Sequence, residues 1–156
     1  MVRMTKYTTK LTETKRVVLE KEFSMNFPGL SHIIRSPQDA VEVGKEFMHI
    51  HEEPEEHLYM ICMNTKNKVT GVFEISHGSV NASIATPREI FQKALLANAV
   101  SIILMHNHPS GDSTPSHADI EMTKRATKAG KIIGVEVLDH IIIGDRYASL
   151  KEKGYC

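Results

Sequence analysis

The feature that most constrains this chain is a pair of histidines at the end of a short apolar run. Residues 100–105 read Val-Ser-Ile-Ile-Leu-Met, and His106 and His108 follow. A short apolar run rich in β-branched residues predicts a buried strand. Because residues two apart on an extended chain point to the same side, both imidazoles are expected to face one point in space. The segment 109–111, Pro-Ser-Gly, then predicts a turn.

A carboxylate is expected to join the two imidazoles. Pro115 and Ser116 predict the entrance to a helix, and Asp119, one turn inside it, can reach back toward the rings. Two imidazoles and one carboxylate suit zinc and leave a fourth position for water, as catalytic zinc sites do. We therefore predict one Zn²⁺ per chain, bound by His106, His108 and Asp119. One alternative stays open, because Ser116 and Asp119 also form a capping-box pattern that any helix start can use.

The residues around this set resemble a known family. His-x-His, seven residues, Ser, two residues, Asp is the pattern of the JAMM (MPN-type) zinc metalloproteases. The segments 106–111, 115–119 and 138–144 (Leu-Asp-His-Ile-Ile-Ile-Gly) are most similar to its RadC branch. The resemblance covers about residues 36–152. It implies the cytidine-deaminase-like sandwich of JAB/MPN domains and a zinc-dependent hydrolase, a metallopeptidase or isopeptidase that acts on an amide bond.

A hydrolase of this kind also needs a general base beside its activated water. In the family a glutamate just before the first core strand has this role, and the matching residue here is Glu56. Glu55 is an alternative one residue away, and Glu74 is a weaker one. The acidic run 52–56 also has the composition of a solvated linker. The resemblance further implies that the Ser116 hydroxyl donates to the developing oxyanion.

Segments of helical and strand character alternate along the chain, which predicts an α/β (α+β) fold with a mixed β-sheet covered by helices. Helices are expected over about 37–50, 87–98 and 116–129, the last stopped by Gly130. Strands are expected over 58–63, 69–76, 100–105, 132–138, 141–143 and 147–150, the first two as a hairpin. We divide the chain into an N-terminal extension, residues 1–31, and a RadC-like JAB/MPN domain, residues 32–156. The extension is expected to form a strand or two, or a packed arm.

Composition narrows the classes of function. The formal net charge of the 156 residues is zero, which gives no electrostatic reason to expect nucleic-acid binding. Cys62 and Cys156 do not make a disulfide framework, and this suits a reducing cytoplasm. No apolar run approaches the ~18 residues of a membrane span. We expect a cytoplasmic enzyme with a peptide or protein substrate, and the resemblance suggests a homodimer.

Two other functions stay open. The first is a DNA-associated factor or metal-dependent nuclease, for which the basic residues of the segment 124–131 are the support. Their helical spacing is more typical of a solvated face. The second is a non-catalytic MPN interaction module, against which the full ligand set argues.

The remaining polar residues near the motif receive weaker assignments. Asn107, Ser110 and Asp112 are expected to orient the metal ligands. His140 is expected to be structural, with a position near the site as the alternative. The other histidines have no partner pattern and are expected on the surface or without a role: His32, His49, His51, His57, His77 and His117.

Overall fold

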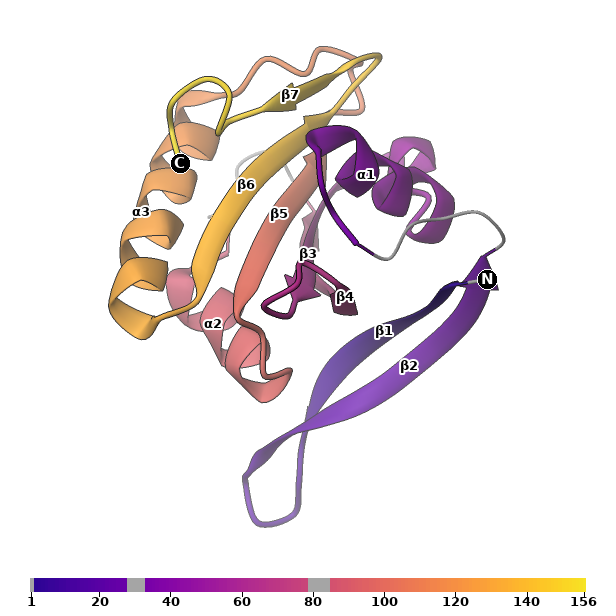
Figure 1. The fold of residues 1–156 in the computed structure, drawn as a ribbon, viewed down its shortest axis with the longest axis vertical. Coiled ribbons are helices and arrows are strands. Elements are labelled where there is room, and N and C mark those ends of the chain that lie inside the picture. Colours follow the sequence, from indigo (N-terminus) through magenta and orange to yellow (C-terminus); the bar gives the residue numbers. More distant parts are fainter. Residues whose placement is uncertain (1, 28–32, 79–84) are drawn as a thin grey trace.

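The computed structural model describes residues 2–27, 33–78 and 85–156, which form one mixed seven-stranded sheet with helices on both faces (Figure 1). The strands are β1 (Val2–Leu11), β2 (Val17–Phe27), β3 (Glu56–Met63), β4 (Val69–Gly78), β5 (Ser101–Asn107), β6 (Glu136–Ile143) and β7 (Tyr147–Ser149). Their order in the sheet is β2-β1-β4-β3-β5-β6-β7. The helices are α1 (Pro37–Glu42), α2 (Pro87–Leu96) and α3 (His117–Ile133), with short turns η1 (Val43–Phe47) and η2 (Ile50–Glu52). Within the described ranges, no helix is long and apolar enough to cross a membrane.

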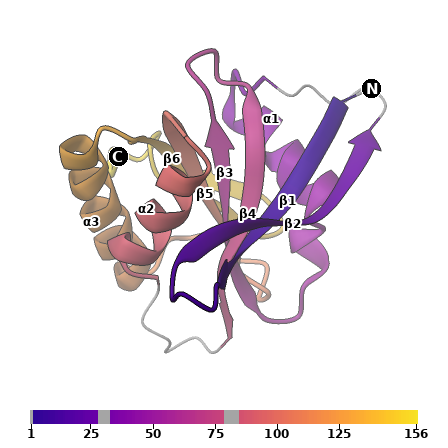
Figure 2. The same cartoon turned by 90° about the horizontal axis from the view of Figure 1, so that it is seen from below.

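The sheet separates two apolar cores, because successive side chains of a strand point to opposite faces. In β5, Ile103 and Met105 belong to the core that includes residues of α1, η1 and η2. Ile102 and Leu104 belong to the core that includes residues of α2 and α3. Figure 2 shows α1 on one side of the sheet and α2 with α3 on the other. The predicted class, a mixed sheet covered by helices, is confirmed, and these layers agree with the sandwich that the resemblance implies.

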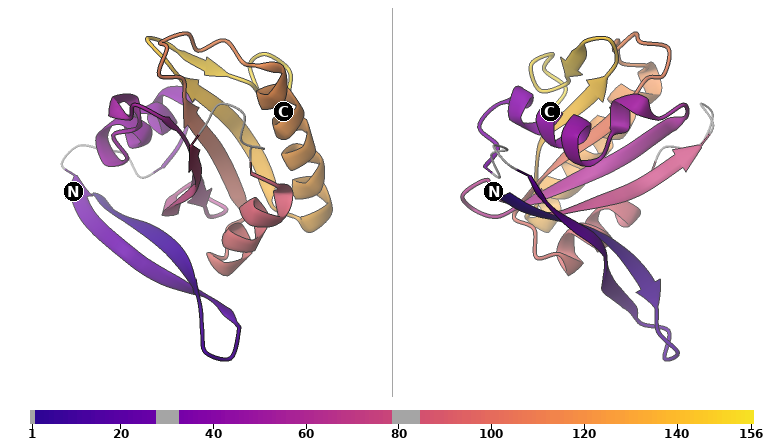
Figure 3. Two further views of the ribbon diagram at one scale, coloured as in Figure 1. Left: turned by 180° about the vertical axis from the view of Figure 1, so that it is seen from behind. Right: turned by 90° about the vertical axis from the view of Figure 1, so that its right-hand side faces the viewer.

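The N-terminal residues form a hairpin that widens the sheet. β1 and β2 pair antiparallel, and β1 pairs parallel with β4 at Lys6–Val72 and Tyr7–Phe73. The far end of the hairpin projects from the rest of the molecule (Figure 3). Of the two alternatives expected for this segment, the structure has the strands.

The pairing around β5 decides which polar strand ends meet. β6 runs parallel to β5 with Ile142 beside His106, and β3 runs antiparallel with Leu58 beside His106. The first residues of β3 therefore lie next to the carboxyl end of β5. This register brings the acidic segment before β3 to the two histidines of the motif.

Three predicted boundaries are wrong. α1 ends at Glu42 and the chain continues as a π-helical turn. α3 runs through Gly130 and stops at Gly134, whose φ is 87°. A Cβ on Gly130 would collide with the Val135 carbonyl oxygen. The glycine therefore allows the chain after α3 to pack closely against the helix. The two strands expected over 132–138 and 141–143 are one strand, β6, because its two central polar residues are buried with hydrogen-bond partners.

Candidate metal centre

The two histidines of the motif lie side by side at the end of β5. The backbone N–H of His108 donates to the Ile143 carbonyl at 2.8 Å, which extends the contact with β6 one residue beyond β5. The ring centroids of His106 and His108 are 4.8 Å apart, and their Nε2 atoms are 2.9 Å apart. His106 is buried and His108 is half-buried. The two-residue spacing thus places both rings against one point, as the sequence predicts.

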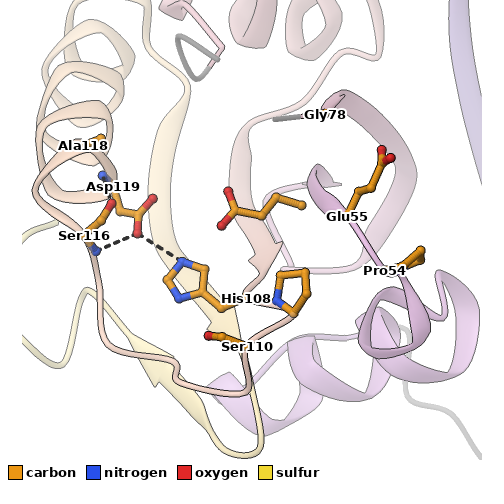
Figure 4. A pocket seen from close by; sticks show the side chains of 10 residues that line it. Pro54, Glu55, Gly78, His108, Ser110, Ser116, Ala118 and Asp119 are labelled. Atoms are coloured by element: carbon orange, nitrogen blue, oxygen red, sulfur yellow. Dashed lines mark hydrogen bonds and ion pairs between the residues drawn. The ribbon is translucent and has the colours of Figure 1, made fainter. Parts of the chain in front are cut away.

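Asp119 completes this group from the first turn of α3. The Ser116 hydroxyl oxygen accepts from the Asp119 N–H at 3.1 Å, and Asp119 Oδ2 accepts from the Ser116 N–H at 2.7 Å. Asp119 Oδ1 lies 3.3 Å from His106 Nε2. Its Oδ2 lies 3.3 Å from His108 Nε2, as Figure 4 shows. The capping box and the ligand set are therefore not alternatives, because the box aims the carboxylate at the two rings.

The three side chains have the spacing of a metal site. One ligand atom of His106, His108 and Asp119 lies within 4.8 Å of the others, so the three can hold a metal ion. A backbone carbonyl only accepts, so the contact of 2.7 Å from His108 Nδ1 to the Asp112 carbonyl requires a hydrogen on Nδ1. When the ring of His108 is neutral, its Nε2 therefore presents a lone pair to the carboxylate. A neighbouring lone pair and a carboxylate repel each other unless a cation or a proton lies between them.

The charges of the group agree with this need for a cation. Burial raises the pKa of Asp119, but its contacts with the imidazoles of His106 and His108 outweigh burial and hold this pKa well below its usual range. A hydrogen bond with Asp119 raises the pKa of His108, against the opposing effect of burial. Asp119 is thus an anion at neutral pH, and the group attracts either a proton on His108 or a metal ion.

His140 contacts His106 on the side away from Asp119. The preferred expectation for His140 was a structural role, with a position near the site as the alternative. Its Nε2 is 2.7 Å from His106 Nδ1, and its Nδ1 is 2.6 Å from the Thr123 hydroxyl oxygen. Complete burial holds the pKa of His140 well below its ordinary value, so the ring is neutral. The less favoured alternative, a position at the site, therefore describes His140 correctly. Thr123 carries no sequence signal beyond its place four residues after Asp119.

An open cavity of about 700 Å³ lies against the group, and its lining includes Glu56, His108, Ser116 and Asp119. Glu56 is half-buried, and its charge contributes to the raised pKa of His108. Glu56 precedes Leu58 by two residues, so the two share a face of the sheet, and Leu58 pairs with His106. Glu55 is exposed, and its carboxylate points away from His108 and Asp119 in Figure 4. Of the two candidate bases, the geometry favours Glu56.

Of the three residues expected to orient the ligands, Asp112 contacts a proposed ligand and the other two do not. The Asn107 side chain accepts from the His57 N–H at 2.7 Å and donates to the carbonyls of Glu53 at 3.2 Å and Glu55 at 2.9 Å. It fixes the segment before Glu56 rather than a ligand. Asp112 acts through its backbone carbonyl, which accepts from His108. Ser110 is one step further away, because its hydroxyl oxygen accepts from the Asp112 N–H at 3.3 Å.

A second group of histidines and carboxylates lies on the other face of β3. It corrects the expectation for His57, which is half-buried, whereas His77 is exposed, as expected. His57 Nδ1 is 2.6 Å from Glu74 Oε1, and its Nε2 is 3.2 Å from Glu53 Oε2. His77 Nδ1 lies 3.6 Å from Glu74 Oε1, so this group also has a spacing that can hold a metal. Both nitrogens of His57 already contact carboxylates, so a network of polar side-chain contacts accounts for this arrangement. Glu74 belongs to this network and does not line the cavity beside His108 and Asp119.

The other four histidines named as surface or incidental fall into two sets. His49, His51 and His117 are exposed, as expected. His32 lies outside the described residues.

Comparisons with known proteins identify the family to which the chain is similar. The family model described as "RadC-like JAB domain" matches residues 34–155. A UPF0758 protein of Caldanaerobacter subterraneus subsp. tengcongensis is 47% identical over 140 residues, which are 89% of this chain and 59% of that protein. A UPF0758 protein of Desulfitobacterium hafniense is 46% identical over 149 residues, or 94% of this chain and 65% of that protein. A third, from a Geobacillus species, is 52% identical over 125 residues, or 80% and 54%. The chain thus spans between about half and two thirds of each of these relatives.

Proposed function

This chain belongs to the RadC-like JAB domain family, and from that premise we propose that it is a zinc-dependent hydrolase of amide bonds, a metallopeptidase or isopeptidase. The observation that carries the proposal is the convergence of two imidazole Nε2 atoms and one carboxylate beside an open cavity. Three ligands of this kind with a free fourth position are typical of catalytic zinc rather than structural zinc.

His106, His108 and Asp119 would hold the ion. When bound, zinc supplies a Lewis acid and lowers the pKa of a water toward ~7, which makes a nucleophile at neutral pH. The fold brings these three side chains together before an ion binds, because their ligand atoms already lie within 4.8 Å of one another. A preformed site of this kind lowers the cost of binding.

Glu56 is the proposed general base and acid. Its carboxylate takes a proton from the attacking water and returns it to the nitrogen of the leaving amine. The half-buried position of Glu56 on the wall of the cavity suits this transfer, because a carboxylate there is screened from bulk water on one side. The Asn107 side chain holds the preceding segment in place for this role.

Ser116 is the proposed donor to the oxyanion. Its hydroxyl oxygen already accepts from the Asp119 N–H, and its own hydrogen remains available for a ligand in the cavity. Donation to the oxygen that gains charge in the transition state stabilises that state more than the substrate. The capping role and the catalytic role of Ser116 are therefore compatible.

The nuclease alternative has less support. Two-metal phosphodiester chemistry uses carboxylates that bridge both ions, and the proposed ligand set contains one carboxylate, Asp119. The basic side chains of α3 are exposed, as expected for a solvated helix face: Lys124, Arg125, Lys128 and Lys131.

Metal content is the first test of the proposal. Purified wild type, His108→Ala and Asp119→Asn would be dialysed and analysed by inductively coupled plasma mass spectrometry. We expect about one zinc per wild-type chain and a loss of zinc in both variants. A peptide-library screen would follow, with Glu56→Gln as the control that keeps zinc and loses turnover. A wild type without retained metal refutes the proposal, and zinc without cleavage of any peptide favours the non-catalytic module.

A further inference from the structure

We infer that Thr123 and His140 are positioning residues that fix the ring of His106 with its Nε2 lone pair facing the metal centre. This inference rests on the proposed function, because it concerns the same three ligands. It assigns a role to two buried residues outside the ligand set and the cavity wall. One chain of hydrogen bonds begins on Asp119, passes through Thr123 and His140, and ends on His106.

The chain begins on the backbone of Asp119. The Thr123 hydroxyl donates to the Asp119 carbonyl oxygen at 2.7 Å, one helical turn back along α3. A hydroxyl has a single hydrogen, so this bond leaves the Thr123 oxygen as an acceptor only. Thr123 is fully buried, and water does not compete for it.

His140, on β6, donates to this hydroxyl oxygen. Its Nδ1 lies 2.6 Å from the Thr123 hydroxyl oxygen, so Nδ1 must carry a hydrogen. The ring is completely buried, and its two nitrogens contact the Thr123 hydroxyl and Nδ1 of His106, neither of which is a carboxylate. A buried imidazole in such surroundings is neutral, so the hydrogen on Nδ1 leaves Nε2 as an acceptor.

The last contact in the chain decides which nitrogen of His106 carries the hydrogen. His106 Nδ1 lies 2.7 Å from the His140 Nε2 acceptor, so His106 Nδ1 must carry a hydrogen. The Nε2 atom of a neutral His106 then has a bare lone pair, and it lies 3.3 Å from Asp119 Oδ1. Metal-bound histidines are commonly oriented in this way, through a hydrogen bond from the other ring nitrogen.

The fold explains how residues so distant in sequence meet. β6 runs parallel to β5 with His140 beside Leu104, and Leu104 shares its face with His106, two residues later. α3 covers that face, so the His140 ring lies between the helix and the end of β5. The contacts join β5, β6 and α3 in a closed loop of side chains. A shift of any one element would change the orientation of both His106 and Asp119.

A matched pair of variants separates this role from simple packing. Thr123→Val keeps the shape of the side chain and removes the hydroxyl, so that the His140 hydrogen can move to Nε2. There it would donate to His106 Nδ1, and the His106 hydrogen would then occupy Nε2 in place of the lone pair. Thr123→Ser keeps the hydroxyl. We expect the zinc dissociation constant, measured by chelator competition, to rise about 10–100-fold in Thr123→Val and to stay within about threefold in Thr123→Ser. Circular dichroism and thermal unfolding would verify that both variants fold.

A measurement on the wild type supports the test independently of any variant. Long-range ¹H–¹⁵N correlation spectra of the metal-free protein, above the pKa of an ordinary histidine, show which ring nitrogen carries hydrogen. We expect hydrogen on Nδ1 of both His106 and His140. A hydrogen on Nε2 of His140 overturns the inference, as does equal zinc affinity in wild type and Thr123→Val, or an equal loss in both variants. A wild type that binds no zinc refutes the proposed function instead, and the spectra still decide the orientation of His106.

Discussion

Replacing Asn107 with alanine tests how the chain holds the proposed base in place. The Asn107 side chain is buried and makes three hydrogen bonds, at 2.7, 2.9 and 3.2 Å, to backbone groups on both sides of Glu56. Each such bond contributes about 0.5–1.5 kcal/mol net. The Glu53 and Glu55 carbonyls belong to a partly exposed segment and regain water when the amide is lost. We therefore expect Asn107→Ala to lower the free energy of unfolding by about 2–4 kcal/mol, measured by urea denaturation.

The same variant separates the base from the metal ligands. Asn107 lies between His106 and His108 in sequence, but alternation along the strand points its side chain to the opposite side. Zinc affinity should therefore change by less than about tenfold, whereas turnover of a substrate found by library screening should fall by about 100-fold because Glu56 is displaced. Hydrogen exchange of the His57 amide should also accelerate, since that N–H loses its acceptor.

Two control variants test whether the Asn107 amide holds this segment. Asn107→Asp keeps an acceptor for the His57 N–H but turns a carboxylate oxygen toward the two carbonyl oxygens, so it should destabilise more than alanine. Asn26→Ala, at an exposed position of edge strand β2, should change the free energy by less than about 0.5 kcal/mol. A loss below about 1 kcal/mol in Asn107→Ala, or an aspartate variant as stable as the wild type, would show that the amide does not hold this segment.

Zinc at about 100 times its Kd should raise the free energy of unfolding by about 2.7 kcal/mol, and scanning fluorimetry should show no such shift for Asp119→Asn. Because the pKa of His108 is raised and that of Asp119 is lowered, protons compete at His108 first on acidification. Zinc affinity should then fall about tenfold per pH unit below the His108 pKa, and an affinity independent of pH there would contradict the ligand assignment. Burial raises the pKa of the Cys62 thiol to about 12, so Ellman's reagent should modify it only after unfolding; rapid modification in the folded state would count against its buried position. A Cβ on Gly144 would press on the Gly111 backbone, so Gly144→Ala should lower stability by about 1–3 kcal/mol in urea denaturation, and a neutral effect would show that this loop yields easily.

The proposed base shows where sequence reasoning needs the fold. Glu55 and Glu56 are adjacent glutamates in one acidic run, so residue type does not distinguish them. Only the pairing of Leu58 with His106 places Glu56 on the face of the two histidines and leaves Glu55 exposed. Glu74 was a third candidate, and the pairing of β3 with β4 directs it to His57 instead. A strand register is a contact between distant segments, so the local sequence does not contain it.

The sequence by itself determined the features that depend on neighbours a few residues apart. The buried strand before His106, the common direction of His106 and His108, and the capping box from Ser116 to Asp119 follow from backbone geometry over one or two turns. Only the tertiary structure decided how β3, β6 and α3 surround this motif. It alone made β6 continuous through Asp139 and His140, because Ser149, Thr123 and His106 satisfy their buried polar groups. Polar residues end a strand when they need water, and they remain inside it when distant segments supply their hydrogen-bond partners.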